Sequence, residues 1–288
     1  MKKDITELFC NVDDFCREVD KIEKSTRIGS NRRPTRTSQL ERSEIITIIL
    51  LYHISPCKNF KFFFKSYLQL YRSDFPKLVS YNRFIELMPR SFSYFLLLLT
   101  SLLNKEDNIH FIDATSLPVC HNKRISRHKV FKGLARRGKT TMGWFFGFKL
   151  HLVINRRGQL AGVQITPGNT DGRAPVRRIV KNLKGLLFAD RGYIGEDLFK
   201  DLFSKGIKLV AGIKKNMKNK LMDVNEKIML RKRSISETVN DYLKNKMNIS
   251  HTRHRSPANA FVHIISTLVA YSLNPRKPSI SKPFLIPN

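Results

Sequence analysis

Three acidic residues lie where apolar runs end or a helix begins, in a sequence that is otherwise very basic. Asp113 follows the apolar run in FIDAT, Asp190 follows the run in LLFADRGY, and Glu237 opens the helix-like segment in RKRSISETV. Carboxylate oxygens are the ligands that Mg²⁺ prefers, and two such ions can activate an attacking oxygen and stabilise a leaving one. Acids surrounded by positive charge therefore indicate a site that binds a hard metal ion and a polyanion at the same time, as in phosphodiester cleavage.

Each acid also has a simpler interpretation, because an isolated aspartate after a strand commonly caps a helix or completes a turn. The two strand-end positions and the helical glutamate together favour metal binding over that alternative. Asp171 is a weaker candidate, since it lies in the turn-like PGNTDGR and is expected to cap the following helix. Asp201 is expected on the polar side of an exposed helix.

The balance of charge predicts a polyanionic partner, most simply DNA or RNA. The chain carries 53 Lys and Arg against 23 Asp and Glu, a formal charge of +30. Residues 101–288 hold 36 of the basic and 12 of the acidic residues, a formal +24. Residues 121–139 contain eight Lys and Arg and no acid, and such a run of like charge is best explained by phosphates that neutralise it. The side chains predicted to bind nucleic acid are Lys123, Arg124, Arg136, Arg137, Arg191, Arg231, Arg233, Arg253 and Arg255.

The cysteines and the apolar runs exclude several other classes. The four cysteines form no CxxC pair, so neither a zinc site nor a disulfide framework is predicted. The apolar runs at 45–54 and 95–103 are shorter than the roughly 20 residues that a membrane-spanning helix needs. The opening MKKDITELFC lacks the pattern of a signal peptide. We therefore expect a cytoplasmic protein with no membrane partner.

Helical patterns fill the first 105 residues. This region is expected either to bind DNA ends or to serve only as a packing domain without base contacts. Ser43 is the predicted N-cap of the second helix, and the polar, basic stretch 25–39 is predicted to be a linker. The predicted helices span about 1–25, 41–54, 58–71, 80–88 and 91–104.

Strand patterns begin near residue 107. NIHFIDATSLPVC is β-like and a hairpin with its turn at Asn155 to Gly158 follows, in which Trp144 begins an apolar strand and is predicted to lie in the core. LLFAD and IKLVAGI are typical of short buried strands, with helical segments around them. The order β-β-β-α-β-α-β-α is that of the ribonuclease H-like fold, of the α+β or α/β class, with a mixed five-stranded sheet and flanking helices.

That topology brings the acids together, because its fourth strand pairs beside the first. Asp113 and Asp190 are then expected to be neighbours at the strand ends, with Glu237 in the first turn of a helix that packs across that edge. The expected domains are a helical N-terminal region at 1–105, a catalytic domain at 106–275 and a flexible tail at 276–288.

Segments along most of the chain resemble the DDE-type transposases of bacterial insertion sequences, in the ribonuclease H-like (retroviral integrase) superfamily. The matching segments are ELFCNVDDFC, FPKLVSYNRFIELMP, FIDATSLPVCHNKRI, HKVFKGLARRGKTTMGWFFGFKLHLVIN, TPGNTDGR, LFADRGYIG, GIKKNMK, RKRSISETV and SHTRHRSPANAF. The resemblance implies that Asp113, Asp190 and Glu237 are catalytic and bind two Mg²⁺ (or Mn²⁺) ions. It also implies binding to the terminal inverted repeats of double-stranded DNA, strand cleavage, joining of 3′-hydroxyl ends to target DNA, and a homodimer or larger assembly near the bacterial nucleoid.

Two other functions remain open at this point. A metal-dependent nuclease of the same fold would share the three acids but lack sequence-specific binding to DNA ends. A basic nucleic-acid-binding protein without catalysis, such as a decayed transposase, would keep the charge and lose dependence on metal.

Overall fold

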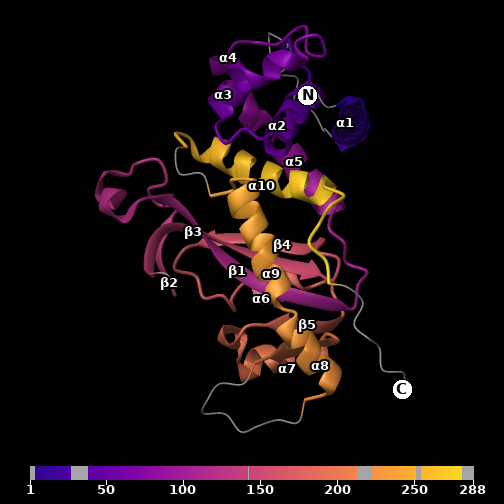
Figure 1. Ribbon diagram of the computed structural model, residues 1–288, viewed down its shortest axis with the longest axis vertical. Coiled ribbons are helices and arrows are strands. Elements are labelled where there is room, and N and C mark those ends of the chain that lie inside the picture. Colours follow the sequence, from indigo (N-terminus) through magenta and orange to yellow (C-terminus); the bar gives the residue numbers. More distant parts are fainter. Residues whose placement is uncertain (1–3, 27–37, 142, 213–221, 251–253, 281–288) are drawn as a thin grey trace. The chain divides into compact units, whose positions relative to one another are not determined.

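The chain forms two compact units that interleave along the sequence. The computed structural model describes residues 4–26, 38–141, 143–212, 222–250 and 254–280 (Figure 1). Unit 1 comprises residues 1–101 and 255–273, and unit 2 comprises residues 102–254 and 274–288. The division predicted from the sequence differs from this grouping, because it placed residues 257–273 with the sheet. Much of the predicted linker at 25–39 and of the predicted tail at 276–288 lies outside the described residues.

Unit 1 is helical in its described part. Its core is formed by helices that are apolar over much of their surface, so that most residues of α2 and α10 are buried. Within this core His53 lies beside Ser266, with 2.8 Å between Nε2 and Oγ, which joins α2 to α10. No helix among the described residues is long and apolar enough to cross a membrane. The helices are α1 (Thr6–Thr26), α2 (Arg42–Ile54), α3 (Phe60–Lys65), α4 (Tyr81–Leu87), α5 (Phe92–Ser101) and α10 (Pro257–Leu273), with 3₁₀ turns η1 (Tyr67–Tyr71) and η2 (Met88–Ser91).

The start of α2 corrects one prediction. Glu41, and not Ser43, is the N-cap, and the backbone N–H of Glu41 donates to the Glu44 carboxylate at 2.7 Å. This reciprocal pairing is a capping box, which satisfies backbone donors that the first turn leaves unpaired. Ser43 is buried inside the helix instead. The prediction was wrong because it considered only the residue type preferred at the cap.

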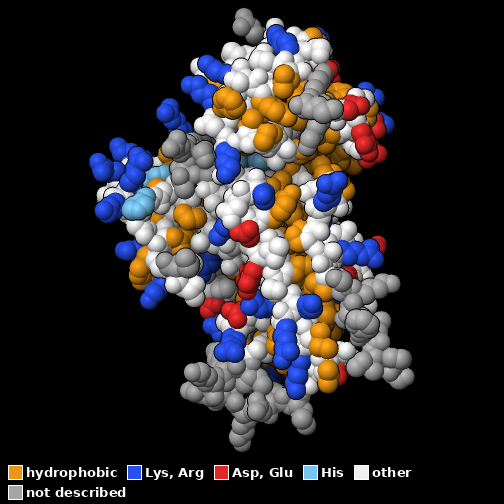
Figure 2. All heavy atoms as spheres, viewed as in Figure 1, with side chains coloured by type: hydrophobic (Ala, Val, Ile, Leu, Met, Phe, Trp, Pro, Cys, Tyr) orange, Lys and Arg blue, Asp and Glu red, His pale blue; other side chains and the backbone are white. Residues whose placement is uncertain are grey.

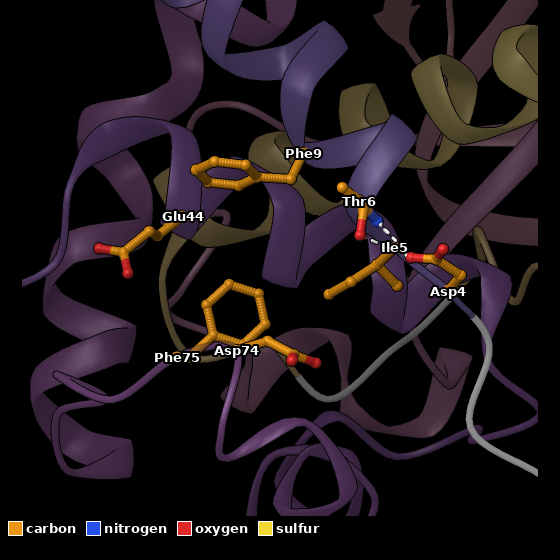
Figure 3. A pocket seen from close by; sticks show the side chains of 7 residues that line it. All are labelled: Asp4, Ile5, Thr6, Phe9, Glu44, Asp74 and Phe75. Carbon is orange, nitrogen blue, oxygen red and sulfur yellow. Dashed lines mark hydrogen bonds between the residues drawn. The ribbon is translucent and has the colours of Figure 1, made fainter.

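A pocket of about 470 Å³ lies beside the start of α1 in unit 1. Figure 3 shows the rings of Phe9 and Phe75 in this pocket with the carboxylates of Asp4, Glu44 and Asp74 around them. Carboxylates repel phosphate, so this pocket is unsuited to a DNA backbone despite the basic character of the whole chain.

Unit 2 is built on a mixed sheet of six strands in the order β2-β3-β1-β5-β6, with β4 also paired to β3. β1 pairs antiparallel with β3 and parallel with β5, and β5 pairs parallel with β6. The predicted mixed sheet is therefore confirmed, but with six strands instead of five, because residues 136–140 pair with the start of the long β3. The predicted turn is confirmed as well, since the Gly158 N–H donates to the Asn155 carbonyl at 3.0 Å. The strands are β1 (Ile109–Cys120), β2 (Arg136–Thr140), β3 (Gly143–Asn155), β4 (Leu160–Pro167), β5 (Gly185–Ala189) and β6 (Ile207–Ala211).

The two faces of this sheet are covered by different helices. Ile112, Leu187 and Leu209 belong to a buried cluster that also contains residues of α6 (Val176–Ile179) and α7 (Glu196–Ser204). Side chains alternate between faces along a strand, so Phe111, Asp113 and their even-numbered partners on β3 and β5 point to the other face. On that side β1 contacts α9 (Ser234–Asp241), which follows α8 (Val224–Arg231) and continues as the π-helical η5 (Tyr242–Lys246).

Candidate active site

Asp113 and Asp190 are brought together by the parallel pairing of β1 and β5. The register pairs Phe111 with Phe188, and both aspartates follow that pair by two residues. That pair is the last of the register, and Asp190 lies just past the end of β5 at Ala189, whereas Asp113 lies inside β1 and not at its end, where it was expected. Neighbouring strands lie about 4.8 Å apart, so the pairing brings the backbone at Asp113 near the backbone at Asp190. Gly185 permits this approach, because its φ is +88° and a Cβ there would lie 2.2 Å from the Asn108 carbonyl oxygen.

Asp190 ends β5 and turns the chain into the short 3₁₀ helix η4 (Arg191–Tyr193). Its carboxylate accepts a 2.7 Å hydrogen bond from the Arg191 backbone N–H, so it does cap the turn that follows. The residue is nevertheless exposed, and one carboxylate can accept several hydrogen bonds or ligate a cation with its remaining lone pairs. The capping role therefore leaves Asp190 available for other contacts.

Glu237 lies in the first turn of α9, the helix that contacts β1. Its side chain is 61% exposed and forms a 3.1 Å ion pair with Arg233, one helical turn before it. Arg233 was predicted to bind nucleic acid, and its guanidinium here faces the acids. This pair keeps the Glu237 carboxylate beside a cation of the protein itself.

Asn240 links α9 directly to β1. Its side-chain amide donates a 2.9 Å hydrogen bond to Asp113 Oδ2. Asn240 is buried one helical turn after Glu237, so the same helix that carries the glutamate also orients the aspartate. The contact was not predicted from the sequence, although the spacing of three residues from Glu237 placed Asn240 on the same side of the helix.

The electrostatics of the site are dominated by burial. Burial raises the pKa of Asp113, while hydrogen bonds from the Ala114 backbone and from Asn240, together with the Arg233 charge, act against the rise. Burial and the charges of Asp113 and Asp190 raise the pKa of Tyr193. Burial lowers the pKa of Lys244, although Asp113 favours its charged form. A buried carboxylate among so few compensating partners is a group that a cation would stabilise.

The chemistry of these donors fits a hard divalent metal ion. All three acids offer oxygen ligands, and two buried polar atoms beside Asp113, the Tyr193 hydroxyl and Asn240 Oδ1, lack a hydrogen-bond partner among the described residues. The metal site is not complete, however. Within the described part of the chain, no three His, Cys, Asp or Glu side chains lie close enough together to hold a metal ion. One reason is that the Glu237 carboxylate is exposed and forms its ion pair with Arg233.

The basic side chains predicted to bind nucleic acid fall on several elements of unit 2. Lys123 and Arg124 lie on the 3₁₀ helix η3 (Asn122–Arg127), and Arg136 and Arg137 lie on β2, all of them exposed. Figure 2 shows Lys and Arg side chains gathered over η3 and acidic side chains over the region of α9. Arg191 follows Asp190 and Arg231 ends α8, both exposed. Arg255 belongs to unit 1, and Arg253 lies outside the described residues.

Two other sequence-based assignments have clear outcomes. Asp171 was expected to cap the following helix, but the N-cap of α6 is Pro175. Asp171 instead forms a 2.7 Å ion pair with Arg173 and accepts its backbone N–H, which lowers the pKa of Asp171 to about 2. Trp144 is 52% exposed, so its predicted place in the core was wrong. The physical reason is that Trp144 lies where only β2 accompanies β3, near the end of the hairpin and away from the helices that cover the sheet.

Comparison with known protein families settles the class of this chain. The family described as Transposase DDE domain matches residues 103–257, more than half of the sequence. The chain belongs to the DDE transposase family. The matched segment begins just before β1 and runs past Asp113, Asp190 and Glu237, so it contains the whole sheet and α9. No curated protein matches this transposase by sequence.

Solved structures agree with the fold. The cryo-EM structure of a piggyBac transposase synaptic complex with hairpin DNA is similar to this transposase with a TM-score of 0.51 and 10% identity, over 84% of this chain and 68% of that chain. At this identity the match supports the ribonuclease H-like fold and not a shared substrate. The crystal structure of the Mos1 strand transfer complex aligns at 9% identity over 89% of this chain and 83% of that chain, with a TM-score of 0.24, which is too low to carry an argument.

Proposed function

We propose that this chain is a DNA transposase that binds the terminal inverted repeats of an insertion sequence, cleaves DNA strands with metal-activated water and joins the 3′-hydroxyl ends to target DNA. Its strongest support is the β1–β5 register, whose last pair, Phe111 and Phe188, lies two residues before Asp113 and Asp190. The piggyBac structure is described as bound to hairpin DNA, and DNA is the partner that the basic composition of this chain favours. Holding two DNA ends calls for a homodimer or a larger assembly.

Asp113, Asp190 and Glu237 are the residues that would hold two Mg²⁺ or Mn²⁺ ions. When bound, such ions supply an activated oxygen nucleophile and stabilise the leaving oxygen of the phosphodiester. The protein's own contribution is positional. Asn240 holds the Asp113 carboxylate through its 2.9 Å hydrogen bond, and β5 sets Asp190 beside it.

Arg233 connects the acids to the DNA. It forms an ion pair with Glu237 in this structure, and a guanidinium can bind a phosphate with two parallel hydrogen bonds. If Glu237 turns to a metal ion, Arg233 loses its carboxylate partner and gains the ability to pair with the phosphate that is cleaved. The Tyr193 hydroxyl, buried and without a partner among the described residues, can hydrogen bond to a water at the same face.

The decisive experiment compares nicking and binding on the same preparations. Asp113→Asn, Asp190→Asn and Glu237→Gln each remove one carboxylate with little change in shape. We expect each to abolish Mg²⁺-dependent nicking of a labelled duplex carrying the inverted repeat that flanks the gene, while the mobility shift survives. Asp201→Asn is the matched control, because Asp201 lies on α7 and pairs with Arg177 and Lys205, away from the acids.

Each contrary result identifies a specific error. A variant that nicks at the parental rate would remove its residue from the site. Equal nicking of unrelated DNA by the parent would identify a metal-dependent nuclease of the same fold. Binding by the parent without any nicking in Mg²⁺ or Mn²⁺ would identify a nucleic-acid-binding protein without catalysis.

A further inference from the structure

Unit 2 carries a hairpin that is basic on one side. β2 and the first residues of β3 pair as a two-stranded ribbon, in which Lys139 lies opposite Trp144 and Arg137 opposite Phe146. Residues directly opposite each other in an antiparallel pair point to the same face. Arg137, Lys139 and Trp144 therefore share one face of the ribbon, and all three are exposed, whereas Gly138 and Phe145 are buried on the other face. We call the three exposed side chains the hairpin cluster.

The members of the hairpin cluster contact one another. The Arg137 guanidinium lies 4.9 Å from the centroid of the Trp144 ring, and Lys139 Nζ lies 5.7 Å from it. The Asn122 side-chain amide donates a 2.6 Å hydrogen bond to the Trp144 carbonyl, which ties the exposed η3 to the same strand. The indole is thus held from the backbone side and flanked by two cations, and still 52% exposed.

Nothing negative lies nearby in the sequence. Between Asp113 and Asp171 the chain contains no Asp or Glu, and it contains 11 Lys and Arg. All eight basic residues of the stretch 121–139 are exposed. An exposed tryptophan that contacts two cations, with no Asp or Glu near them in the sequence, is suited to stack against a base. The two cations would then bind the flanking phosphates.

The hairpin cluster faces the same side of the sheet as Asp113. Asp113 pairs with Leu152 on β3, and Trp144 precedes Leu152 by eight residues, an even number. Both side chains therefore point to one face, and at about 3.3 Å per residue they lie roughly 26 Å apart along the strand. A DNA strand leaving the acids along this face would reach the hairpin cluster about eight nucleotides away, at roughly 3.4 Å per nucleotide.

We propose that Trp144, Arg137 and Lys139 form a second DNA contact, about eight nucleotides from the cleaved bond. There, one base that has left the DNA stack would lie against the indole, and the two cations would bind the adjoining phosphates. An intact duplex keeps its base faces stacked on each other, so an exposed indole is suited to a base that has left the stack. This inference rests on the proposed transposase function, since it takes DNA as the ligand, and it adds a site outside the three acids.

The chain offers a direct probe, because Trp144 is its only tryptophan. We expect its emission to be quenched when a single-stranded oligonucleotide is added to the full-length protein, and acrylamide quenching of the bound state to fall. The intact duplex of the same sequence should quench less than the single strand. Asp201→Asn should give the same quenching as the parent, because Asp201 lies on α7, where it pairs with Arg177 and Lys205.

The contribution of the hairpin cluster to DNA affinity can be measured with variants, by fluorescence anisotropy of labelled DNA. Trp144→Ala should weaken single-strand binding by about 5- to 150-fold, the range that one stacked base contributes, and Trp144→Phe should restore part of it. Phe203→Ala is the matched control, since Phe203 is a 63% exposed aromatic on α7, which covers the opposite face of the sheet. It should bind like the parent.

The outcomes separate this site from the proposed function. If labelled DNA binds but Trp144 emission and its accessibility to acrylamide stay unchanged, the hairpin cluster is not a DNA contact and the transposase proposal stands. If the intact duplex quenches more than the single strand, the assignment to an unstacked base is wrong. If no DNA binds the parent at low salt, the proposed function itself fails.

Discussion

The rings of Phe111 and Phe188 stack across β1 and β5 with their centroids 5.4 Å apart. They are also register partners in the parallel pair, and each lies two residues before an aspartate of the candidate site. Both rings are fully buried. The pair therefore fixes the alignment of two strand ends, and through that alignment the separation of Asp113 and Asp190.

Removing one of these rings should affect stability and cleavage together. Phe188→Ala leaves a cavity and should lower the free energy of unfolding by about 3–5 kcal/mol. Phe188→Leu keeps a buried apolar side chain, should lose about 1 kcal/mol and should stay folded at room temperature. We expect the leucine variant to nick DNA more slowly than the parent, as measured on equal amounts of folded protein. Parental nicking by this variant would show that the ring pair does not position the aspartates.

Asp113 should destabilise the metal-free protein at neutral pH. Burial raises the pKa of Asp113, so the folded state holds this proton to higher pH than the unfolded chain, and ionisation at neutral pH favours unfolding. We expect Asp113→Asn to raise Tm at pH 7 without divalent ions, and the gain to shrink as pH falls through the raised folded-state pKa and to vanish below the unfolded-state pKa of about 3.9, where the acid is protonated in both states.

Adding Mg²⁺ should reverse the order in the same thermal experiment. A ligand that binds only the folded state stabilises it by RT ln(1 + L/Kd), where L is the free ligand concentration, so the stabilisation grows with the logarithm of that concentration once it exceeds Kd. We expect Tm of the parent to rise with Mg²⁺ and that of Asp113→Asn to stay level. An equal rise in both proteins would mean that the ion binds elsewhere.

Asn240 is expected to act as a positioning residue through Asp113. Its hydrogen bond favours the ionised carboxylate, so Asn240→Leu should raise the pKa of Asp113 further. The lower limb of the pH–rate profile for nicking should then move to higher pH, and DNA binding at pH 7 should be unchanged. Asn240→Gln can restore a donor and should recover part of the profile. A fall in rate without any movement of the pH profile would indicate a structural effect alone.

Phosphate contacts should give DNA binding a steep dependence on salt. Lys123 and Arg124 are exposed on η3, and each neutralised phosphate contributes about 0.9 to the slope of log K against log salt. Replacing both by Ala should flatten that slope by about 2 and weaken binding to specific and unrelated DNA alike. Lys181→Ala with Lys184→Ala, a pair near the start of β5, is the control with the same loss of charge. A loss of sequence preference in the η3 variant would show that η3 reads bases.

The sequence was most informative where local pattern and topology agree. β5 is a short apolar run that ends just before Asp190, as predicted, whereas Asp113 lies inside the longer β1 and not at a strand end. The right pairing of the two strands followed once the order of elements matched a known sheet. Exposure of Trp144 was not predictable in this way, because an apolar strand near a hairpin end has the same pattern whether or not a helix covers it. The hydrogen bond from Asn240 to Asp113 and the burial of Tyr193 within the electrostatic influence of both aspartates were missed as well, since polar and aromatic side chains at such positions carry no distinctive spacing. Whether the three acids hold metal together stays a prediction.

Unit 1 is assembled from two segments, residues 1–101 and 255–273, that flank a long stretch of unit 2, and this has a consequence for the order of events during synthesis. Residues 102–254 emerge as one continuous stretch that contains every described strand and all three acids. α2 and α5 are made before this stretch, and their partner α10 is made only after it. Domains generally fold as units during synthesis, so the sheet can form while the first helices still expose apolar surface. A product that stops after residue 254 would keep the acids and lack one wall of the helical unit.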